Sequence, residues 1–432
     1  MTDAVATTGT APGPRVFASN ARIKARYAAE RRFRLYGVIA ISIALSFLAL
    51  LMGRIISQGY TAFWTHSVSV QVYLDPNRLD ARDLQGANYD MLIATALLKT
   101  LHVPDDDLGE NAAKAKQLLS RQLGYDLLTR LKARPDLIGR TVTLTGAVSA
   151  NADLYYKGQI KRSTPQEFRK IDDAALAWLD RLKASGVVSA GFNQGIFLRS
   201  DSTEPELAGV LGALVGSALT LFLTAALCIP IGVLAALFLE EFARKGRITD
   251  FIEVNINNLA AVPSIVYGLL GLAVFINWMG LPRSTPVVGA LVLALMVMPT
   301  VIIAARSALK AVPPSIREAA LGVGASRTQT VFHHVLPLAM PGIMTGSILA
   351  MAHALGETAP LLMIGMVAFV PGVPQGFTSA ATVLPVQIFI WADASERAFY
   401  ERTAAAILVL LAFMILMNAA AIILRRRFER RW

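Results

Sequence analysis

The chain has 432 residues, of which 54% are hydrophobic and 16% are charged, and its mean hydropathy is +0.51. This composition excludes an ordinary water-soluble protein, in which about 25% of the residues are charged and about half or fewer are apolar. The single cysteine, Cys228, excludes an intrachain disulfide and a metal site built from cysteines.

The formal net charge of +11 is typical of a nucleic-acid-binding protein, but the distribution of the charge argues against that function. Residues 58–206 carry 18 basic and 18 acidic side chains, so the positive excess lies beside the apolar segments. There it orients helices and meets anionic lipid. No nucleic-acid-binding motif accompanies it, so we expect the lipid bilayer, and no nucleic acid, as a partner.

Residues 1–34 are predicted to be a basic cytoplasmic segment, of which 1–20, rich in Ala, Thr, Gly and Pro, is disordered. An uncharged run follows at 35–53. About 20 apolar residues cross a bilayer as a helix, so residues 35–57 are predicted to be the first transmembrane helix. The run comes after seven basic residues and lacks a small-residue cleavage site, which indicates an uncleaved signal anchor.

Residues 58–206 have the composition of a soluble domain and are numerous enough to bury a core. Alternating apolar residues predict strands at 67–74 and 140–148. Helical spacing of apolar residues predicts helices at 82–102, 110–133 and 165–184. We therefore expect a small periplasmic α+β domain, in which the sequence shows no catalytic constellation and indicates no role.

Residues 207–424 are predicted to be the membrane core. Lipid offers no hydrogen bonds to a bare backbone, and continuous apolar runs favour helices over the alternating strands of a barrel. The predicted spans of the core are 208–239, 255–278, 286–305, 338–368 and 403–424. With the first helix they make an all-α polytopic membrane protein of six transmembrane helices, with the α+β domain inserted between helices 1 and 2.

The placement of Lys and Arg predicts the orientation. With the N-terminus inside, the cytoplasmic segments 15–34, 240–253, 306–327 and 425–431 hold 7, 3, 4 and 5 basic residues, or 19 in all. The short external loops hold only Arg283, Arg397 and Arg402. Basic residues concentrate on the cytoplasmic side of membrane proteins. Both termini, including the basic tail 425–432, are therefore expected in the cytoplasm.

Helix signals cluster between two apolar runs, in the loop 306–337. Ser315 with Glu318, and Ser326 with Gln329, each have the spacing of a capping box, in which the two side chains satisfy free amides at a helix start. A first short helix is therefore expected, followed by a second that enters the membrane.

The first of these helices is predicted at about 316–323, and Gly324 can take the left-handed conformation that ends it. A short capped helix between two spans is what a membrane protein offers to the groove of a soluble partner. The alternative is that Glu318 is a local cap without a partner.

Glu357 is the one carboxylate that interrupts the apolar spans after residue 254, and His353 lies four residues earlier on the same helix face. The apolar length beyond it, 358–370, favours a position within the hydrocarbon. Ionisable groups there usually face a polar interior. We expect His353, Glu357 and Thr358 on a translocation route or its gate. The alternative is a structural pair of Glu357 with His353 or with an arginine of a neighbouring subunit.

A second polar segment precedes Pro263 in the stretch NINNLAAVPSIVYG. Polar groups at such a position bond across helices or line an internal route. Asn258 and Ser264 are the candidates for that role. A helix-entry cap followed by a proline kink is the alternative.

The spacing around Glu318 resembles the EAA loop of the permeases of ABC importers, E-A-A-x3-G-x9-I-x-L-P, except that His334 stands at the apolar position. In that family the loop is the coupling helix that docks on the ATP-hydrolysing subunit. The resemblance therefore implies a coupling role for Ser315, Glu318, Ala319, Ala320, Gly324 and Ser326.

Three further stretches resemble the phosphate-import permeases of the PstA type: LAAVPSIVYGLLGLA at 259–273, LVLALMVMPTVI at 291–302 and AHALGETAPLL at 352–362. The resemblance covers about 205–424, although an arginine commonly stands in that family where this chain has His353. It implies the type I ABC importer permease architecture in a bacterial inner membrane. The implied partners are a dimer of ATP-binding subunits, a second permease of the PstC type and a periplasmic phosphate-binding protein.

The resemblance implies a permease subunit for inorganic phosphate, whereas the residues alone leave the substrate open, since a lone glutamate repels an anion unless it is paired or protonated. The alternatives are import of another oxyanion, such as a phosphonate or molybdate, and a membrane-anchored phosphate-status sensor or scaffold. The sequence has no G-x-x-x-x-G-K-[ST] loop, Ser/His/Asp set, HExxH or metal cluster. We therefore expect no enzyme activity, catalytic residue, metal or cofactor, with ATP bound by a partner subunit.

Overall fold

The computed structural model describes residues 20–77, 79, 83–104 and 108–428. Of the residues predicted to be disordered, 1–20, all but Asn20 lie outside the described residues, as do the last residues of the basic tail, and Asn20 is helical. The chain divides into two compact units, Met1–Ile55 and Ile56–Trp432.

Helix α1 (Asn20–Gly59) makes up the described part of the first unit and ends in the second. Its 40 residues correspond to a length of about 60 Å, twice the thickness of a hydrocarbon core. The predicted first span, 35–57, is therefore confirmed as helix but is only part of it. The helix begins earlier because Ala, Arg, Lys and Glu of residues 20–34 are good helix formers.

A three-stranded antiparallel sheet organises the residues that follow. Its strands β1 (Trp64–Tyr73), β2 (Thr141–Ala147) and β3 (Val188–Phe192) lie in the order β2-β1-β3. The first two confirm the predicted strands. The third was not predicted, because its sequence VSAGF is short, contains Gly and Ala, and is mostly exposed instead of alternating.

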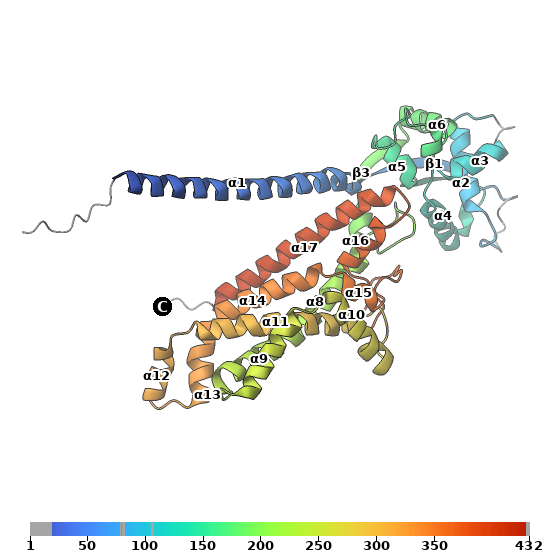
Figure 1. The fold of residues 1–432 in the computed structure, drawn as a ribbon. Coiled ribbons are helices and arrows are strands. Elements are labelled where there is room, and N and C mark those ends of the chain that lie inside the picture. Colours follow the sequence, from blue (N-terminus) through green and yellow to red (C-terminus); the bar gives the residue numbers. More distant parts are fainter. Residues whose placement is uncertain (1–19, 78, 80–82, 105–107, 429–432) are drawn as a thin grey trace, which may run out of the picture. The chain divides into compact units, whose positions relative to one another are not determined.

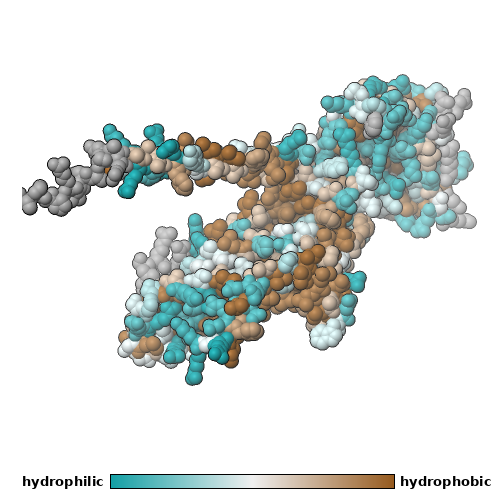
Figure 2. Space-filling view, in the orientation of Figure 1, coloured by the Kyte–Doolittle hydropathy of each residue, from teal (hydrophilic) through white to brown (hydrophobic). Residues whose placement is uncertain are grey.

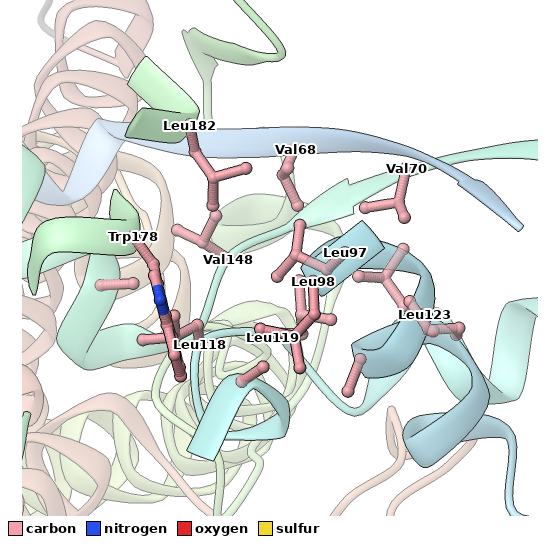
Figure 3. Packing of buried hydrophobic residues seen from close by; sticks show 14 of the residues in the cluster. Val68, Val70, Leu97, Leu98, Leu118, Leu119, Leu123, Val148, Trp178 and Leu182 are labelled. Carbon is pink, nitrogen blue, oxygen red and sulfur yellow. The ribbon is translucent and has the colours of Figure 1, made fainter. Parts of the chain in front are cut away.

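Helices pack on one face of this sheet. They are α2 (Tyr89–Thr100), α3 (Leu108–Lys116), α4 (Gln122–Ala133), α5 (Ala150–Tyr156) and α6 (Asp173–Ala184). Buried Val68 and Val70 of β1 meet Leu97, Leu98, Leu123 and Trp178 in the core that Figure 3 shows. The short α7 (Gly195–Leu198) lies outside this core, and its Ile196 is buried with Ala62 and Ala405. The predicted helix 110–133 is two helices, because the backbone of Leu119 leaves the helical path and pairs with Val148. Helix α5 was not predicted.

The membrane core contains the long apolar helices. They are α8 (Leu211–Leu237), α9 (Arg247–Ala260), α10 (Ser264–Gly271), α11 (Pro286–Lys310), α14 (Leu336–Gly356) and α17 (Ala398–Phe428). Helix α11 packs on α8 and α14, and α14 packs on α17. Within the described residues, five helices are long and apolar enough to cross a membrane, or six if the bent pair α9 and α10 is one span.

Two predicted spans differ from the structure. The span 255–278 is broken, since α9 and the helix that begins at Ser264 meet at 98°. Pro263 causes the break because it has no N–H to donate and because it disfavours helical geometry at the residue before it.

The span predicted at 338–368 ends at Gly356. Glu357 has an extended backbone, and Ala359–Met363 forms a separate short helix, α15. The remaining apolar residues run through an irregular segment to the short helix α16 (Leu384–Ala392). Continuous hydrophobicity therefore overestimated the length of this helix, because the pattern does not reveal where the backbone turns.

Hydrophobic surface covers the long helices of the second unit, and hydrophilic surface covers the sheet domain (Figure 2). A second hydrophilic region lies around α12 (Pro314–Gly322) and α13 (Arg327–Gln329), at the opposite end of the core from the domain (Figure 1). The second unit thus has two polar ends separated by an apolar band.

Candidate functional site

The predicted short helix is α12, and its start differs from the prediction. Pro313 is its N-cap, Pro314 is its first residue, and no side chain caps it. Proline is favoured at the first helical position, where its missing N–H costs nothing. The predicted capping box of Ser315 and Glu318 is therefore wrong, because the helix begins before Ser315.

The end of α12 follows the prediction. Gly324 has φ +88°, and its N–H donates to the Leu321 carbonyl at 3.0 Å. The Ala325 N–H donates to the Ala320 carbonyl at 3.1 Å. These two bonds form a Schellman motif, which ends a helix with a left-handed residue. A Cβ at Gly324 would meet nothing within 4 Å, so the positive φ and not the space requires glycine.

The second predicted capping box is confirmed. Ser326 accepts a hydrogen bond from the Gln329 N–H at 3.3 Å, and Gln329 Oε1 accepts one from the Ser326 N–H at 2.9 Å. This cap starts α13, which continues through a π-helical turn, Thr330–Val335, into α14. The continuous helical segment Arg327–Gly356 therefore connects the turn after α12 directly to a span.

Arg317 fastens α12 to the core. Its Nη2 lies 2.6 Å from Glu241 Oε1, in the π-helical turn Phe238–Phe242 that follows α8, and donates to the Leu309 carbonyl at 3.0 Å. Its Nη1 donates to the Val312 carbonyl at 2.8 Å. The carboxylate of Glu241 is largely buried. One guanidinium thus joins α12 to the segments in which α8 and α11 end.

The two faces of α12 differ in exposure. Ile316 and Ala320 pack toward the core, with Ala320 buried. The residues that face outward are Ser315, Glu318, Ala319, Leu321 and Val323, and Val323 is 86% exposed. Because no side chain caps α12, the structure does not bear out the local-cap alternative for Glu318. The outward face therefore presents the carboxylate of Glu318 together with the apolar side chains of Leu321 and Val323.

Glu357 lies at the other end of α14. His353 Nε2 is 3.3 Å from Glu357 Oε1; His353 is exposed, whereas the side chain of Glu357 is mostly buried. The structure thus brings His353 and Glu357 together, as the spacing predicted. Residues 358–370 do not continue the helix, so their length does not argue for a deep position of Glu357. Thr358, the next residue, is half-buried and is the N-cap of α15.

The helix that follows the break, α10, lies against α15. Tyr267 stabilises the break through its hydroxyl, which donates to the Leu259 carbonyl at 2.7 Å. A Cβ at Gly268 would lie 2.7 Å from Pro360 Cα, so α10 and α15 touch along their backbones. Asn258 before the break is exposed, and Ser264 after it is half-buried. The contact brings the polar segment around Ser264 near the segment that follows Glu357.

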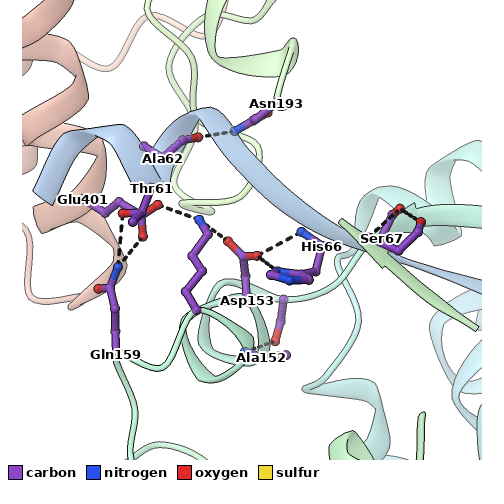
Figure 4. Close-up of polar contacts among 12 residues, drawn as sticks. Thr61, Ala62, His66, Ser67, Ala152, Asp153, Gln159, Asn193 and Glu401 are labelled. Carbon is purple, nitrogen blue, oxygen red and sulfur yellow. Dashed lines mark hydrogen bonds and ion pairs between the residues drawn. The ribbon is translucent and has the colours of Figure 1, made fainter. Parts of the chain in front are cut away.

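A buried cluster of charges joins the sheet domain to the start of α17 (Figure 4). Lys157 Nζ lies 2.7 Å from Asp153 Oδ2 and 2.5 Å from Glu401 Oε1, and all three side chains are buried. His66 Nδ1 lies 2.8 Å from Asp153 Oδ1. Gln159 Nε2 donates to Glu401 Oε2 at 3.1 Å. The sheet domain and α17 therefore contact each other through buried charged groups, each of which has a partner.

Further ion pairs surround this cluster. Arg121 Nη1 lies 3.3 Å from Glu204 Oε1, and Lys170 Nζ lies 3.1 Å from Glu396 Oε1. They line a cavity of about 780 Å³, in which the cations of the domain face carboxylates of the segments that lead into α8 and α17. Within the described part of the chain, no group of three His, Cys, Asp or Glu could hold a metal ion.

Burial and charge shift the carboxyl groups of this joint in opposite directions. Burial raises the pKa of Asp153, but hydrogen bonds from His66 and the charge of Lys157 outweigh it and hold that pKa below its ordinary value. Burial raises the pKa of Glu206, although it accepts a hydrogen bond from the Ala150 N–H at 3.2 Å. The ionised form of Asp153 is therefore part of the folded joint.

Sequence reasoning missed the residues that fasten these sites. The signals for Glu241 were two adjacent carboxylates, Glu240-Glu241, at the end of a span in an otherwise basic segment. The signal for Glu401 was a charged residue at the start of the last apolar run. Neither signal names its partner, because Arg317 is 76 residues from Glu241 and Lys157 is 244 residues from Glu401.

Two family models match the chain. Residues 228–432 match the family described as "Binding-protein-dependent transport system inner membrane component", and residues 20–166 match a domain of unknown function, DUF3333. The first covers most of the membrane core and the whole loop 306–337. The second covers α1 and most of the sheet domain.

Curated proteins with similar sequences are permeases. "Phosphate transport system permease protein PstA 1" of Mycobacterium tuberculosis (strain CDC 1551 / Oshkosh) is 33% identical over 231 residues, which cover 53% of this chain and 74% of that protein. "Probable ABC transporter permease protein YqgI" of Bacillus subtilis (strain 168) is 39% identical over 154 residues, 36% of this chain and 52% of that one. The chain thus spans about half the length of YqgI and about three quarters of PstA 1.

Among solved structures, a chain of the MetNI methionine ABC transporter in an inward-facing conformation is 18% identical, with a TM-score of 0.43, and the match covers 51% of this chain and 96% of that chain.

Replacing Arg317 with Met is expected to loosen α12, because Glu241 then stays largely buried without its partner, at a cost on the order of 1–3 kcal/mol. Hydrogen–deuterium exchange of the amides of 314–323 in the full-length chain should become about tenfold faster, since 1.4 kcal/mol corresponds to a factor of ten. Arg327→Met, which removes an exposed cation from α13, is the matched control. Equal exchange in both variants would show that Arg317 does not hold the helix.

Replacing Lys157 with Met is expected to open the joint, because Asp153 and Glu401 lose a common buried partner, and breaking a buried ion pair costs about 3–5 kcal/mol. Since the folded pKa of Asp153 is lowered, its contribution is present above the ordinary carboxyl range and is lost only as the pH falls through that lowered value.

The amides of 150–157 should therefore exchange more than about tenfold faster than in the wild type at neutral pH, and Lys161→Met, which changes an exposed lysine of the same domain, should have no effect. If the two lysine variants behave alike, the joint is not held by Lys157.

Proposed function

Because the chain belongs to the family of PstA-type phosphate transport permeases, we propose that it is the permease subunit of an ATP-binding-cassette importer that moves inorganic phosphate across the inner membrane. Its described helices make it a multi-pass membrane protein. The observation that carries the proposal is the exposed, rigidly anchored helix α12 at the polar end of the core opposite the sheet domain.

The geometry of α12 supports a docking role. Its inner face is fixed by Arg317, and its ends are defined by Pro314 and by the Schellman motif at Gly324. Its outer face offers Glu318 and the apolar tip at Val323 to a groove. A separate ATPase that closes on this face would move α8, α11 and α14 together, because they are tied to the loop directly. ATP would be bound by that partner, and this chain would need no cofactor and have no enzyme activity of its own.

The segments around Glu357 and Ser264 support a role in the route or its gate. They belong to two broken helices, α14–α15 and α9–α10, that touch at Gly268 and Pro360. Breaks of this kind leave backbone groups that must be satisfied inside protein or beside a water-filled cavity. In this proposal Glu357 orients His353, whose ring N–H groups can donate to an oxyanion.

The proposed assembly follows from the family. A second permease of the PstC type would complete the route, two ATP-binding subunits would dock on the coupling loops, and a periplasmic phosphate-binding protein would deliver the substrate. Both termini and α12 would lie in the cytoplasm, and the sheet domain in the periplasm, as the distribution of Lys and Arg predicts.

Replacing Glu318 with Ala and Gly324 with Val together should abolish association with the ATPase subunit. The first change removes the exposed carboxylate of α12, and a β-branched residue at φ +88° costs on the order of 1–3 kcal/mol. Co-purification of the ATPase with the tagged complex measures the effect, with Thr328→Ala at an exposed position of α13 as the control. Unchanged co-purification would show that this loop does not dock on the ATPase.

Replacing Glu357 with Gln should lower the initial rate of labelled phosphate uptake at least about tenfold, a loss of about 1.4 kcal/mol, while the complex assembles normally. Glu167→Gln, an exposed carboxylate of the sheet domain, is the control. Competition by a phosphonate or molybdate tests the substrate in the same assay. A normal uptake rate in Glu357→Gln would leave this carboxylate as a structural partner of His353.

A further inference from the structure

An exposed aromatic patch lies where the sheet domain meets the outer ends of the spans. Its members come from the turn after α1, the start of β1, the end of β3 and α7, and we call them together the aromatic patch: Tyr60, Phe63, Trp64, Phe192, Phe197 and Leu198. Five of the six are classed as exposed, and Leu198 is 67% exposed.

The patch is rigid. The rings of Phe63 and Phe197 stack with centroids 5.6 Å apart, and those of Trp64 and Phe192 meet edge to face at 6.3 Å. Asn193 locks the two segments together, since its backbone N–H donates to the Phe63 carbonyl at 2.8 Å and its Nδ2 to the Ala62 carbonyl at 3.0 Å. Exposed aromatic rings held in one arrangement indicate a surface built for a partner.

Contacts with α17 place one side of the patch at the edge of the apolar band. Gly59, just before the patch, packs so closely on α17 that a Cβ there would lie 2.9 Å from Leu408 Cδ1 and from the Ala404 carbonyl carbon. The uncharged run of α17 begins at Thr403. Gly59 therefore lies beside the first turns of the uncharged part of α17. Residues 60–64 follow Gly59 directly in the chain.

Contacts with α8 place the other side of the aromatic patch at the edge of the apolar band as well. The Val210 N–H donates to the Ile196 carbonyl at 2.8 Å, and the Leu211 N–H donates to the Arg199 carbonyl at 3.0 Å. Helix α8 starts at Leu211, near the beginning of the uncharged run 207–239. Phe197 and Leu198 thus lie at the mouth of a second span.

The chemistry of the patch matches the membrane–water interface. Neither 60–64 nor 192–198 contains a charged residue, and exposed Arg199 follows directly. Trp and Tyr are enriched at this depth, where an apolar ring meets lipid and its polar atom meets water. A cation beside them can pair with lipid phosphate.

We propose that the aromatic patch is seated in the headgroup region of the outer lipid leaflet. The sheet domain then has two fixed points, the charged joint on α17 and a lipid contact between the exit of α1 and the entry of α8. It lies against the membrane and does not swing on its connections. This inference concerns the domain and does not depend on the transported substrate.

Spin labels at the patch test the proposal in the assembled complex reconstituted into phosphatidylethanolamine–phosphatidylglycerol vesicles. Cys228 is the chain's single cysteine and is buried, so Cys228→Ala gives a background for Leu198→Cys and, as a second position, Tyr60→Cys. The control is Tyr125→Cys, which is equally exposed but lies on α4, a helix that packs on α2 and β2.

Collision with oxygen, which concentrates in lipid, is compared with collision with a water-soluble nickel chelate. We expect the oxygen-to-nickel ratio at residues 198 and 60 to exceed the ratio at residue 125 severalfold. A ratio equal to that at residue 125 would place the patch in water and overturn the proposal. Low collision with both reagents at both positions would show a protein cover, such as another subunit, and would overturn it equally.

Discussion

The position of α12 on the membrane core depends most directly on the ion pair between Arg317 and Glu241. An isolated nine-residue helix is marginal in water, and the outer face of α12 is left bare. The helix keeps its position because one guanidinium, placed between a buried carboxylate and the carbonyl ends of α11, links it to two spans. A force applied to the exposed face therefore reaches the membrane helices through a short, polar and well-satisfied connection.

Buried ion pairs also fix the contact at the opposite end of the core. There Lys157 bridges Asp153 of the domain and Glu401 of α17, while Arg121 and Lys170 pair with carboxylates of neighbouring segments. Ion pairs of this kind fix geometry better than they add stability, because burial of the charges offsets much of their attraction. The sheet domain is thus held in a defined position on the last span, which a flexible tether would not provide.

Sequence patterns predicted what local chemistry determines. The left-handed Gly324, the capping box at Ser326 and the apolar spans follow from residue type and spacing alone. The patterns failed where tertiary contacts decide: the helix predicted from 338 to 368 ends at Gly356, and β3 exists because β1 pairs with it. The fastening contacts could not be predicted, because Arg317 and Glu241 approach each other only after the spans have packed.

The side of the membrane on which α12 lies tests the account most directly. Val323, at the tip of the loop, is 86% exposed, so Val323→Cys in the Cys228→Ala background presents a single accessible thiol. A membrane-impermeant maleimide should label it in inverted inner-membrane vesicles, with bound ATPase slowing the reaction, and should leave it unlabelled in intact spheroplasts. Labelling in intact spheroplasts would place the loop in the periplasm and contradict its proposed role as the contact with a cytoplasmic ATPase.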